Sequence, residues 1–324
     1  MRIRSVVVNE VGGSEVLRLE ESELPEPAPG QVRVRTSVCG VNYIDVYMRS
    51  GLYPRPLPFA LGLEGAGEVE SLGAGVEGLA QGDRVAWASV PGSYASGVLA
   101  PASSVVRVPD GLSDERAAAC MLQGMTAHYL AHGTRQTRRG DTALVHAAAG
   151  GAGLLLVQTL ARAGARVIGT CSTAEKEALA RAAGASEVIR YSEVEFAPVV
   201  RELTGGRGVD VVYDSVGQST FEGSLSCLRP RGLLVLFGQS SGPVPPFDLN
   251  RLNGAGSLFV TRPSLAHYLL DRDELEERAG AVLGAVAAGA LDVRIGGRFA
   301  LERAAEAHDA LESRATSGKL LLDV

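Results

Sequence analysis

Cysteine is scarce in this chain, and its spacing excludes two common uses of the residue. The four cysteines, Cys39, Cys120, Cys171 and Cys227, lie far apart and form no C-x-x-C pair. Such spacing supports neither a disulfide framework nor a zinc knuckle. Four reduced thiols in or near the core are therefore expected.

Long hydrophobic runs are also missing. No apolar segment approaches the roughly 20 residues that are needed to cross a bilayer. The longest candidate, residues 281–291, is short and contains two glycines. The apolar run at residues 6–8 is much shorter than the hydrophobic region of a signal peptide. We therefore expect a cytoplasmic protein without a membrane-spanning segment.

Lysine is scarce as well, and positive charge is not in excess. Only Lys176 and Lys319 are lysines among the 31 basic residues, and the net charge is −6. A nucleic-acid-binding protein would present a basic face, so a nucleic-acid partner is not expected. The hydrophobic content of 46% and the charged content of 21% are typical of a globular protein. A length of 324 residues suits two domains.

The pattern of apolar runs predicts two domains of different class. The first 110 residues contain short runs separated by Gly, Pro and Asp, which favours a compact β-barrel. From Asp141 onward, apolar runs at 142–147, 166–170, 209–213 and 232–237 alternate with helical patterns at 153–163, 174–183, 193–203 and 218–227. This alternation indicates a parallel sheet with helices on both faces.

The C-terminal segments are too few to form a domain of their own, so we expect them to complete the N-terminal barrel. They comprise an apolar run at 297–301, a helix at 304–312 and a strand at 319–324. The sequence therefore predicts an α/β protein. Its barrel domain spans residues 1–122 and 265–324, and its Rossmann domain, a doubly wound parallel sheet, spans residues 123–264.

The strongest chemical signal is a glycine-rich turn between the first strand and the first helix of the Rossmann pattern. Ala148, Gly150 and Gly153 occupy the three small positions of an A-x-G-x-x-G motif. Small residues there permit a tight turn and a close approach of backbone N–H groups to a diphosphate. The helix that begins near Gly151 adds the positive end of its dipole. The turn predicts a dinucleotide site.

The end of the second Rossmann strand favours NADPH over NADH. An NAD site places an acidic residue there to bind the ribose hydroxyls. This chain has Ser172 and Thr173 instead, followed by Lys176. Hydroxyl and ammonium groups bind a 2′-phosphate, which a carboxylate would repel. The alternative for Lys176 is a solvated helix lysine, the usual environment of this residue.

Five segments resemble the medium-chain dehydrogenase/reductases, and more closely their NADPH:quinone oxidoreductase branch, which includes zeta-crystallin. They are 49–54 (Arg-Ser-Gly-Leu-Tyr-Pro), 147–153 (Ala-Ala-Ala-Gly-Gly-Ala-Gly), 212–217 (Val-Tyr-Asp-Ser-Val-Gly), 260–265 (Val-Thr-Arg-Pro-Ser-Leu) and 311–316 (Leu-Glu-Ser-Arg-Ala-Thr). The segments at 40–45 and 62–67 agree as well. The resemblance covers essentially the whole chain and implies a GroES-like catalytic barrel joined to a Rossmann domain.

The resemblance also implies a zinc-free site. Zinc-dependent relatives place a cysteine where this chain has Asn42 and a histidine where it has Leu63. An amide and a leucine cannot supply the thiolate and imidazole of a catalytic zinc site. Cys39 lies three residues too early to replace the missing ligand. No metal is therefore expected.

The family's functional residues map onto named positions of this chain. Asn42, Asp45, Tyr47 and Tyr53 are expected to line the cleft beside the nicotinamide and to form the catalytic set. The expected cofactor-binding residues are Asn42, Thr126, Gly150, Gly151, Ala152, Thr173, Lys176, Tyr191, Ser215, Phe237, Gly238, Ser240, Thr261, Arg262 and Arg314. Simpler roles remain open for some of them: Asn42 and Asp45 could cap a turn or a helix, the tyrosines could be core residues, and Arg314 could be a surface arginine.

The function that these features imply is zinc-independent hydride transfer from NADPH to a quinone. Without a metal to act as Lewis acid, an acceptor that delocalises negative charge suits the site better than an alcohol. One alternative is an enoyl or alkenal reductase that acts on α,β-unsaturated carbonyls. Another is a non-catalytic, crystallin-like or RNA-binding protein that merely holds NADPH. A homodimer is expected from the resemblance, through a sheet edge near residues 257–261.

Overall fold

The computed structural model describes every residue from Met1 to Val324, and the chain forms two compact units. Unit 1 contains Met1–Met125 and Leu269–Val324, and unit 2 contains Thr126–Tyr268. These boundaries fall a few residues beyond the positions that the sequence indicates. None of the helices combines the length and the apolar character required to cross a membrane.

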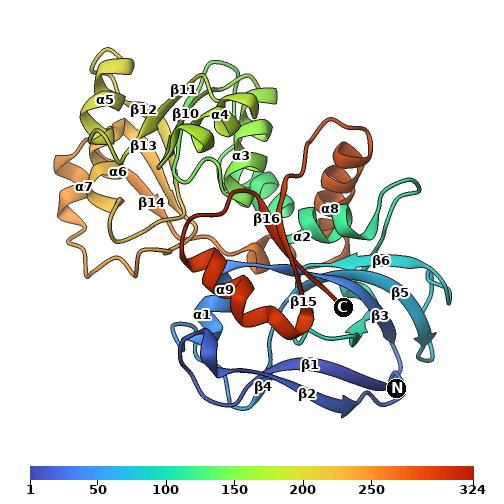
Figure 1. The fold of residues 1–324 in the computed structure, drawn as a ribbon. Coiled ribbons are helices and arrows are strands. Elements are labelled where there is room, and N and C mark those ends of the chain that lie inside the picture. The colour runs from blue at the N-terminus through green and yellow to red at the C-terminus, as the bar shows by residue number, and fades with distance from the viewer. The chain divides into compact units, whose positions relative to one another are not determined.

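The larger sheet of unit 1 joins the two ends of the chain. It contains β3 (Gln31–Val41), β5 (Glu64–Leu72), β6 (Arg84–Trp87), β7 (Gly97–Pro101), β8 (Val106–Arg107), β15 (Ile295–Ala300) and β16 (Lys319–Asp323). Its seven strands follow the order β15-β16-β3-β5-β6-β8, with β7 paired to β3 beside this path. The C-terminal strand β16 is antiparallel to β3, so the final segment completes the N-terminal sheet (Figure 1).

A smaller sheet and four helices complete unit 1. The sheet contains β1 (Arg2–Val8), β2 (Leu17–Glu23) and β4 (Phe59–Ala60), in the order β2-β1-β4. The helices are α1 (Tyr43–Arg49), α2 (Asp114–Tyr129), which continues into unit 2 from Thr126 onward, α8 (Arg272–Ala287) and α9 (Ala304–Glu312), with short 3-10 turns at Ser14–Val16, Ala102–Ser104 and Leu301–Arg303. Ser113 caps α2: its hydroxyl accepts the Arg116 N–H at 3.3 Å.

Unit 2 is a doubly wound parallel sheet. Its strands are β9 (Thr142–Val145), β10 (Arg166–Cys171), β11 (Glu187–Arg190), β12 (Val209–Asp214), β13 (Leu228–Leu236) and β14 (Phe259–Thr261). All adjacent strands are parallel, in the order β11-β10-β9-β12-β13-β14. The strand order reverses direction between β9 and β12, which is where open α/β sheets bind their ligands.

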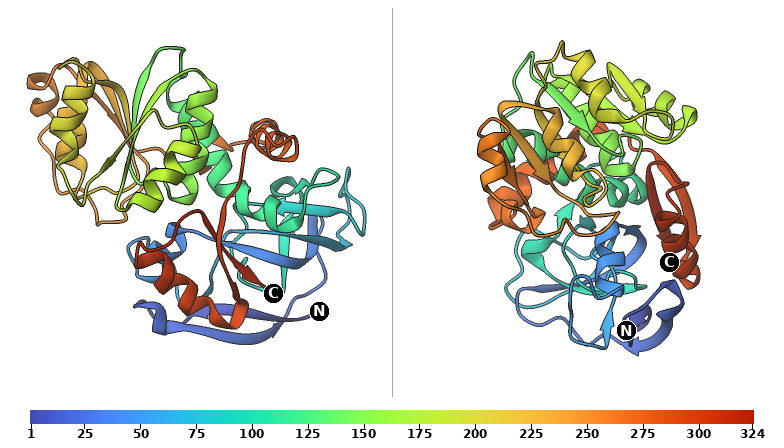
Figure 2. Two further views of the ribbon diagram at one scale, coloured as in Figure 1. Left: turned by 45° about the horizontal axis from the view of Figure 1, so that its top comes forward. Right: turned by 90° about the vertical axis from the view of Figure 1, so that its left-hand side faces the viewer.

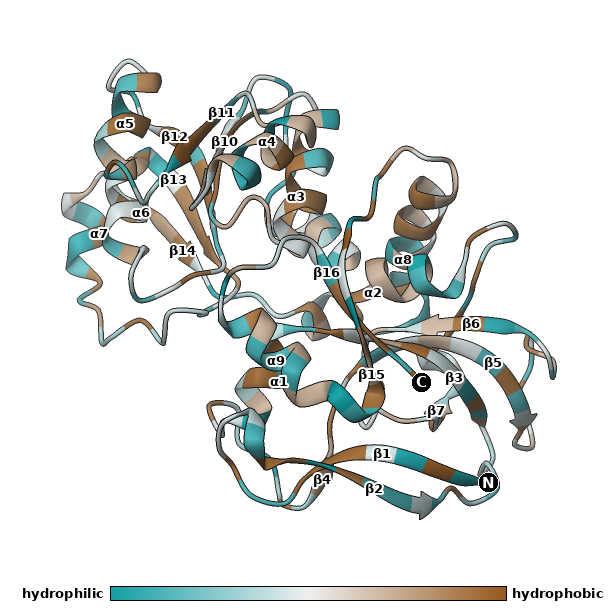
Figure 3. Ribbon diagram, in the orientation of Figure 1, coloured by the Kyte–Doolittle hydropathy of each residue, from teal (hydrophilic) through white to brown (hydrophobic).

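Helices cover both faces of this sheet. α3 (Gly151–Arg162) packs beside α4 (Ala174–Ala182), and α5 (Phe196–Leu203) packs beside α6 (Phe221–Cys227), one pair on each face (Figure 2). Every residue of β9 and β12 is buried, and the central strands are largely hydrophobic (Figure 3). Such runs are typical of a parallel sheet that is covered twice. α7 (Asn250–Gly254), a π-helical turn at Leu130–Thr134 and a 3-10 turn at Leu265–Tyr268 complete the unit.

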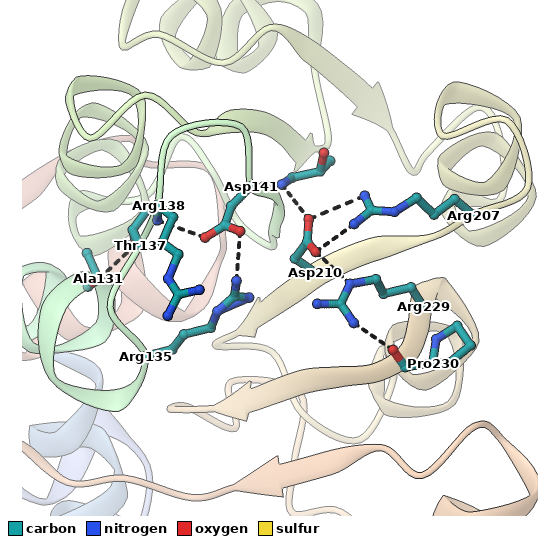
Figure 4. A network of polar contacts seen from close by, with 10 residues as sticks. Ala131, Arg135, Thr137, Arg138, Asp141, Arg207, Asp210, Arg229 and Pro230 are labelled. Carbon is teal, nitrogen blue, oxygen red and sulfur yellow. Dashed lines mark hydrogen bonds and ion pairs between the residues drawn. The ribbon is translucent and has the colours of Figure 1, made fainter.

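An arginine–aspartate network closes the amino edge of the same sheet (Figure 4). Asp210 Oδ2 accepts the Thr142 N–H at 2.8 Å, and Asp210 Oδ1 pairs with Arg229 at 2.6 Å and with Arg207 at 2.9 Å. Asp141 Oδ1 binds Arg135 at 2.7 Å. These contacts fix the start of β9 relative to β12 and leave the carboxyl edge available for a ligand.

Candidate active site

The glycine-rich turn follows β9 in a strained, tightly packed conformation. Ala147 adopts a φ of 50°, and its carbonyl accepts the Gly150 N–H at 2.9 Å. The Ala148 N–H bonds to the Thr170 carbonyl of β10 at 3.0 Å. A Cβ atom at Gly153 would overlap the Ala147 carbonyl oxygen. Only glycine therefore allows α3 to approach the turn this closely.

The first turn of α3 offers an anion site. Gly150 is the N-cap and has no side chain that could occupy the helix end, and the first turn contains no acidic residue. The N–H groups of Gly151, Ala152 and Gly153 have no partner within the helix, because an α-helix leaves its first N–H groups unpaired. Together with the helix dipole, these donors suit a diphosphate. The turn therefore fits a dinucleotide, as the sequence predicts.

Polar side chains gather at the end of β10. Thr173 is the N-cap of α4, and its Oγ1 accepts the Lys176 N–H at 3.3 Å. Burial lowers the pKa of the Lys176 ammonium. Tyr191 follows β11, its N–H donates to the Cys171 carbonyl at 3.0 Å, and 48% of its surface is exposed. Ser192, which the sequence did not single out, donates from Oγ to the Ser172 carbonyl at 2.6 Å.

The other predicted cofactor residues of unit 2 lie at the carboxyl ends of β12, β13 and β14. The Ser240 N–H donates to the Ser215 carbonyl at 3.2 Å, and a Cβ at Gly238 would press against the same carbonyl. Thr261 ends β14 and is the register partner of Val235 on β13. Phe237 and Arg262 adjoin this edge, and Thr126 is buried in α2. Within unit 2 the structure therefore brings the predicted residues, Thr126 apart, to one edge of the sheet.

His146 follows β9 but belongs to a buried network. Its Nδ1 lies 3.0 Å from Thr170 Oγ1, and its Nε2 lies 3.0 Å from Ser224 Oγ. Ser224 donates to Asp214 Oδ2 at 2.8 Å. Burial lowers the pKa of His146, which favours the neutral ring. The histidine therefore ties β9, β10 and β12 together beneath the carboxyl edge, a structural role.

In unit 1, the predicted catalytic residues lie in and around α1. Asn42 is the N-cap, and its N–H donates to Asp45 Oδ2 at 2.8 Å, one half of a capping box. The rings of Tyr47 and Tyr53 are 5.2 Å apart, and Tyr43 adds a third ring 6.0 Å from Tyr47. The three tyrosines form an aromatic cluster, called the tyrosine cluster below.

Asp45 is fully buried, so its carboxylate does not reach a surface. Tyr94 donates to Asp45 Oδ2 at 2.9 Å, and Tyr94 also lies 3.3 Å from His308 Nε2. Burial raises the pKa of Asp45 to about 7, against the lowering effect of its hydrogen bonds from Asn42 and Tyr94. Asp45 is therefore not the N-cap that the sequence left open as its alternative: Asn42 is the N-cap, and Asp45, the third residue of α1, accepts from the Asn42 N–H. Arg314, the remaining predicted residue of unit 1, follows α9 with a φ of 57° and is exposed.

The surroundings of Asn42 do not suit a zinc ion. Lys319 Nζ donates to Asn42 Oδ1 at 2.7 Å and forms an ion pair with Glu64 Oε2. No three His, Cys, Asp or Glu side chains gather anywhere in the chain to hold a metal ion. A divalent cation at Glu64 would meet a buried ammonium group, which repels it. The sequence did not predict that Lys319 pairs with Glu64 beside Asn42. The rarity of lysine in the chain was the one signal that could have drawn attention to Lys319.

Comparisons with known proteins agree with this architecture. The family described as alcohol dehydrogenase GroES-like domain matches residues 28–110, and the one described as zinc-binding dehydrogenase matches residues 151–275. The quinone oxidoreductase of Pseudomonas aeruginosa is 48% identical over 96% of each chain. A 2-haloacrylate reductase of a Burkholderia species is 43% identical over 99% of this chain and 98% of its own.

A solved structure is equally similar. The quinone oxidoreductase of Escherichia coli, crystallised in complex with NADPH, superposes with a TM-score of 0.97 at 43% identity, over 99% of this chain and all of the other. The glycine turn, the doubly wound sheet and the GroES-like unit occur together here with a donor set that does not fit zinc. The chain belongs to the zinc-free medium-chain dehydrogenase/reductases, in their quinone oxidoreductase branch.

Proposed function

We propose that this chain is an NADPH-dependent, zinc-independent quinone oxidoreductase. The observation that carries the proposal is the end of β10, where Thr173 and Lys176 stand in place of an acidic residue. A carboxylate there would bind the ribose of NADH, whereas a hydroxyl and an ammonium suit the 2′-phosphate of NADPH. The quinone oxidoreductase relatives, one of them crystallised with NADPH, support the same assignment.

Different residues of unit 2 bind different parts of the cofactor. The N–H groups of Gly151, Ala152 and Gly153 bind the diphosphate, and Gly150, whose own N–H bonds to the Ala147 carbonyl, leaves room for it. Thr173, Lys176 and Tyr191 bind the 2′-phosphate end. The adenosine and nicotinamide sides are assigned to the residues of the carboxyl edge, Ser215, Phe237, Gly238, Ser240, Thr261 and Arg262, together with Thr126 of α2. When bound, NADPH supplies the hydride, and the protein supplies orientation and electrostatics.

Unit 1 supplies the acceptor side. Tyr53 is half-buried and offers an aromatic face on which a quinone can stack, and the buried Tyr47 ring packs beside it. Asn42 and Asp45 hold the first turn of α1 in place and so set the direction in which these rings point. Arg314, in the loop after α9, is assigned to the cofactor on the family resemblance alone. Because no metal ligand set gathers near Asn42, the acceptor must carry the developing negative charge itself, which a quinone does by delocalisation.

A second candidate acceptor is a C=C bond conjugated to a carbonyl or carboxylate group. The 2-haloacrylate reductase relative, at 43% identity over nearly the full length, is the observation that favours it. The two reactions share the hydride donor and differ in the atom that receives the hydride. Carbon receives it in an enal or an acrylate, so the substrate must present its β-carbon to the nicotinamide.

A substrate panel tests both candidates. The purified chain is incubated with benzoquinones, naphthoquinones, enals, 2-haloacrylates and simple alcohols, and the oxidation of NADPH and NADH is followed by absorbance. We expect quinones to be reduced fastest, NADPH to be preferred and a zinc chelator to have no effect. Faster turnover of enals or 2-haloacrylates would replace the quinone assignment with the second candidate. NADH preference would overturn the assignment of Thr173 and Lys176.

We infer that two copies of the chain associate through β14. This strand ends the six-stranded sheet, and the exposed fractions of Phe259 and Val260 are 60% and 39%. An apolar edge strand with unpaired backbone groups pairs readily with another strand. Light scattering should give twice the chain mass, and Phe259→Glu should give the single mass.

The four buried free thiols fit a reducing, cytoplasmic environment.

A further inference from the structure

Lys319 places a positive charge in the interior of unit 1. The side chain opens β16 and is 1% exposed, and its ion-pair partner Glu64, at the start of β5, is fully buried. Removing two charges from water carries a large desolvation cost, and a buried ion pair rarely stabilises a fold more than apolar residues of the same size. Stability alone therefore does not account for this pair.

The ammonium fixes the orientation of the Asn42 amide. Asn42 Oδ1 accepts from Lys319 Nζ at 2.7 Å and from Gln123 Nε2 at 3.4 Å. Asn42 Nδ2 donates to Glu64 Oε2 at 2.8 Å and to the Gly40 carbonyl at 3.3 Å. An ammonium only donates and a carboxylate only accepts, so the amide fits in one orientation. All of its hydrogen-bonding positions are occupied by the protein.

The same cluster joins four elements of unit 1. Glu64 Oε1 accepts the N–H of Leu122, within α2, at 2.6 Å, and its other oxygen meets Lys319 of β16 and Asn42 at the start of α1. A Cβ at Gly40 would overlap both the Glu64 carboxylate and the Lys319 side chain, so glycine at the end of β3 is required for this approach. We call Lys319, Glu64 and Asn42 the buried triad.

The buried triad acts on the tyrosine cluster through α1. Asn42 is the N-cap, and its N–H holds Asp45 in the first turn. Tyr47 lies one turn further along, and its carbonyl accepts the Tyr53 N–H at 2.9 Å. The backbone of α1 therefore joins the Asn42 cap to Tyr47, and the hydrogen bond from the Tyr53 N–H joins Tyr47 to Tyr53.

We propose that Lys319 is a positioning residue for the reduction: a tethered cation that gathers Glu64 and Asn42, as a metal ion would, and thereby sets the direction of α1 and its tyrosines. The proposal rests on the proposed function only in that the acceptor is reduced beside α1. It assigns no chemical step to the ammonium, which touches no reacting atom.

The charge-neutral double variant Lys319→Met/Glu64→Gln separates positioning from folding. It leaves no unpaired buried charge, and the carbonyl of the introduced amide can still accept the Leu122 N–H. The N–H₂ of that amide then faces the Asn42 amide, which must turn to be satisfied. The matched control is Arg33→Met/Glu70→Gln, which neutralises another ion pair between β3 and β5, with Arg33 Nε 2.7 Å from Glu70. Folding of both variants is checked by the emission of Trp87, the only tryptophan, which is fully buried in unit 1.

Turnover is the first measurement, made with the acceptor that the wild-type chain reduces fastest. We expect the double variant to bind NADPH with unchanged affinity, because the groups assigned to the diphosphate and to the 2′-phosphate belong to unit 2. We expect its kcat to fall on the order of 10- to 100-fold, as for a displaced positioning group. The control should keep wild-type kcat. A folded double variant with wild-type kcat would overturn the proposal, whereas a wild-type chain inactive on the whole panel would overturn the proposed function instead.

The second measurement needs no substrate. The chain has four asparagines, Asn9, Asn42, Asn250 and Asn253, so protein labelled with ¹⁵N-asparagine gives four side-chain amide pairs by NMR. In the wild type, the Asn42 amide protons should exchange slowly. In the double variant their resonances should shift and their exchange should accelerate. Lys319→Arg, which keeps the charge but moves the donors, should do the same if the double variant fails to fold. An Asn42 amide that is unchanged in a folded variant contradicts the proposal.

Discussion

The hydroxyl of Tyr94 donates to Asp45 Oδ2 at 2.9 Å, while Asp45 Oδ1 is buried without a hydrogen-bond partner. A carboxylate with an unsatisfied oxygen in an apolar interior is less stable than the protonated acid. Burial accordingly raises the pKa of Asp45 to about 7. The site beside α1 therefore holds a carboxyl group that changes its charge near neutral pH.

This shift predicts a pH-dependent stability. In the unfolded chain the pKa of Asp45 is near 3.8, so the folded state binds the proton more tightly. The Asp45 contribution is complete below pH 4 and is lost as the pH rises toward 7. Asp45→Asn keeps an acceptor for Asn42 and removes the charge. Relative to the wild type, its free energy of unfolding should increase by up to about 3 kcal/mol between pH 5 and 8.

Urea unfolding followed by Trp87 emission measures this difference. The exposed Asp309→Asn serves as the control and should track the wild type at every pH. A constant difference between Asp45→Asn and the wild type from pH 5 to 8 would show that Asp45 stays ionised in the fold.

His308 predicts the opposite dependence in the acid range. Burial, and then the neighbouring Arg49, lower its pKa to about 3. Because the unfolded chain binds the proton more tightly, the stability from His308 is complete above pH 6.5 and is lost as the pH falls. The Asp45→Asn variant isolates this effect, so its free energy of unfolding should decrease steadily from pH 6.5 to 4. His308→Gln in the same background should flatten that slope.

The end of β10 predicts a selective change in cofactor affinity. Lys176→Glu reverses the charge at the expected 2′-phosphate position. We expect the Kd of NADPH to rise by roughly 10- to 100-fold, about 1.4 to 2.8 kcal/mol, and that of NADH to stay within about threefold. Titration calorimetry measures both. Arg181→Glu, on the same helix, should leave the ratio unchanged; equal losses for both cofactors in Lys176→Glu would mean that the lysine does not contact the phosphate.

The sequence predicted unit 2 better than unit 1 for a physical reason. In a parallel sheet all strands end at one edge, so residues that follow strands, such as Gly150, Thr173 and Ser215, gather there once the strands are identified. β2 was not identified because its residues Leu17–Glu23 are mostly exposed and polar. β11 and α1 are short and gave no periodic signal.

The buried triad could not be derived from local patterns. Lys319 and Glu64 are 255 positions apart and meet only because β16 returns to pair with β3. Asp45 illustrates the same limit: its sequence position suggested a residue of the cleft, and the fold buries it against Tyr94. The sheet topology predicts which side chains lie at one edge of a parallel sheet. Contacts between elements that are distant in the sequence can be identified only in the packed structure.

We expect alanine to be tolerated less well at Gly153, in the glycine-rich turn, than at Gly284, which is exposed in α8. Gly153→Ala puts a methyl group against the Ala147 carbonyl, so the turn must open. We expect a loss of about 1–3 kcal/mol in stability and at least a roughly tenfold rise in the Kd of NADPH, because the diphosphate donors move. Gly284→Ala, exposed in α8 with open space around it, should stabilise the chain by about 0.5–1 kcal/mol. Thermal unfolding and calorimetry distinguish the two, and unchanged NADPH affinity in Gly153→Ala would argue against the assigned turn.

We expect substitution of Asp210 to lower the stability of the chain without lowering its activity. It is 3% exposed and accepts from Thr142, Arg229 and Arg207 at the amino edge of the sheet, opposite the cofactor residues. Asp210→Asn keeps an acceptor for the Thr142 N–H but leaves Arg229, 26% exposed, without its charged partner. The free energy of unfolding should fall by roughly 2–3 kcal/mol, less than the roughly 3–5 kcal/mol for a broken, fully buried pair, because the arginine is partly solvated. The rise in melting temperature on adding NADPH should match that of the wild type, since the binding site is unchanged. A fall in kcat/KM of about tenfold, some 1.4 kcal/mol, would instead mean that this edge communicates with the cofactor edge through β9 and β12.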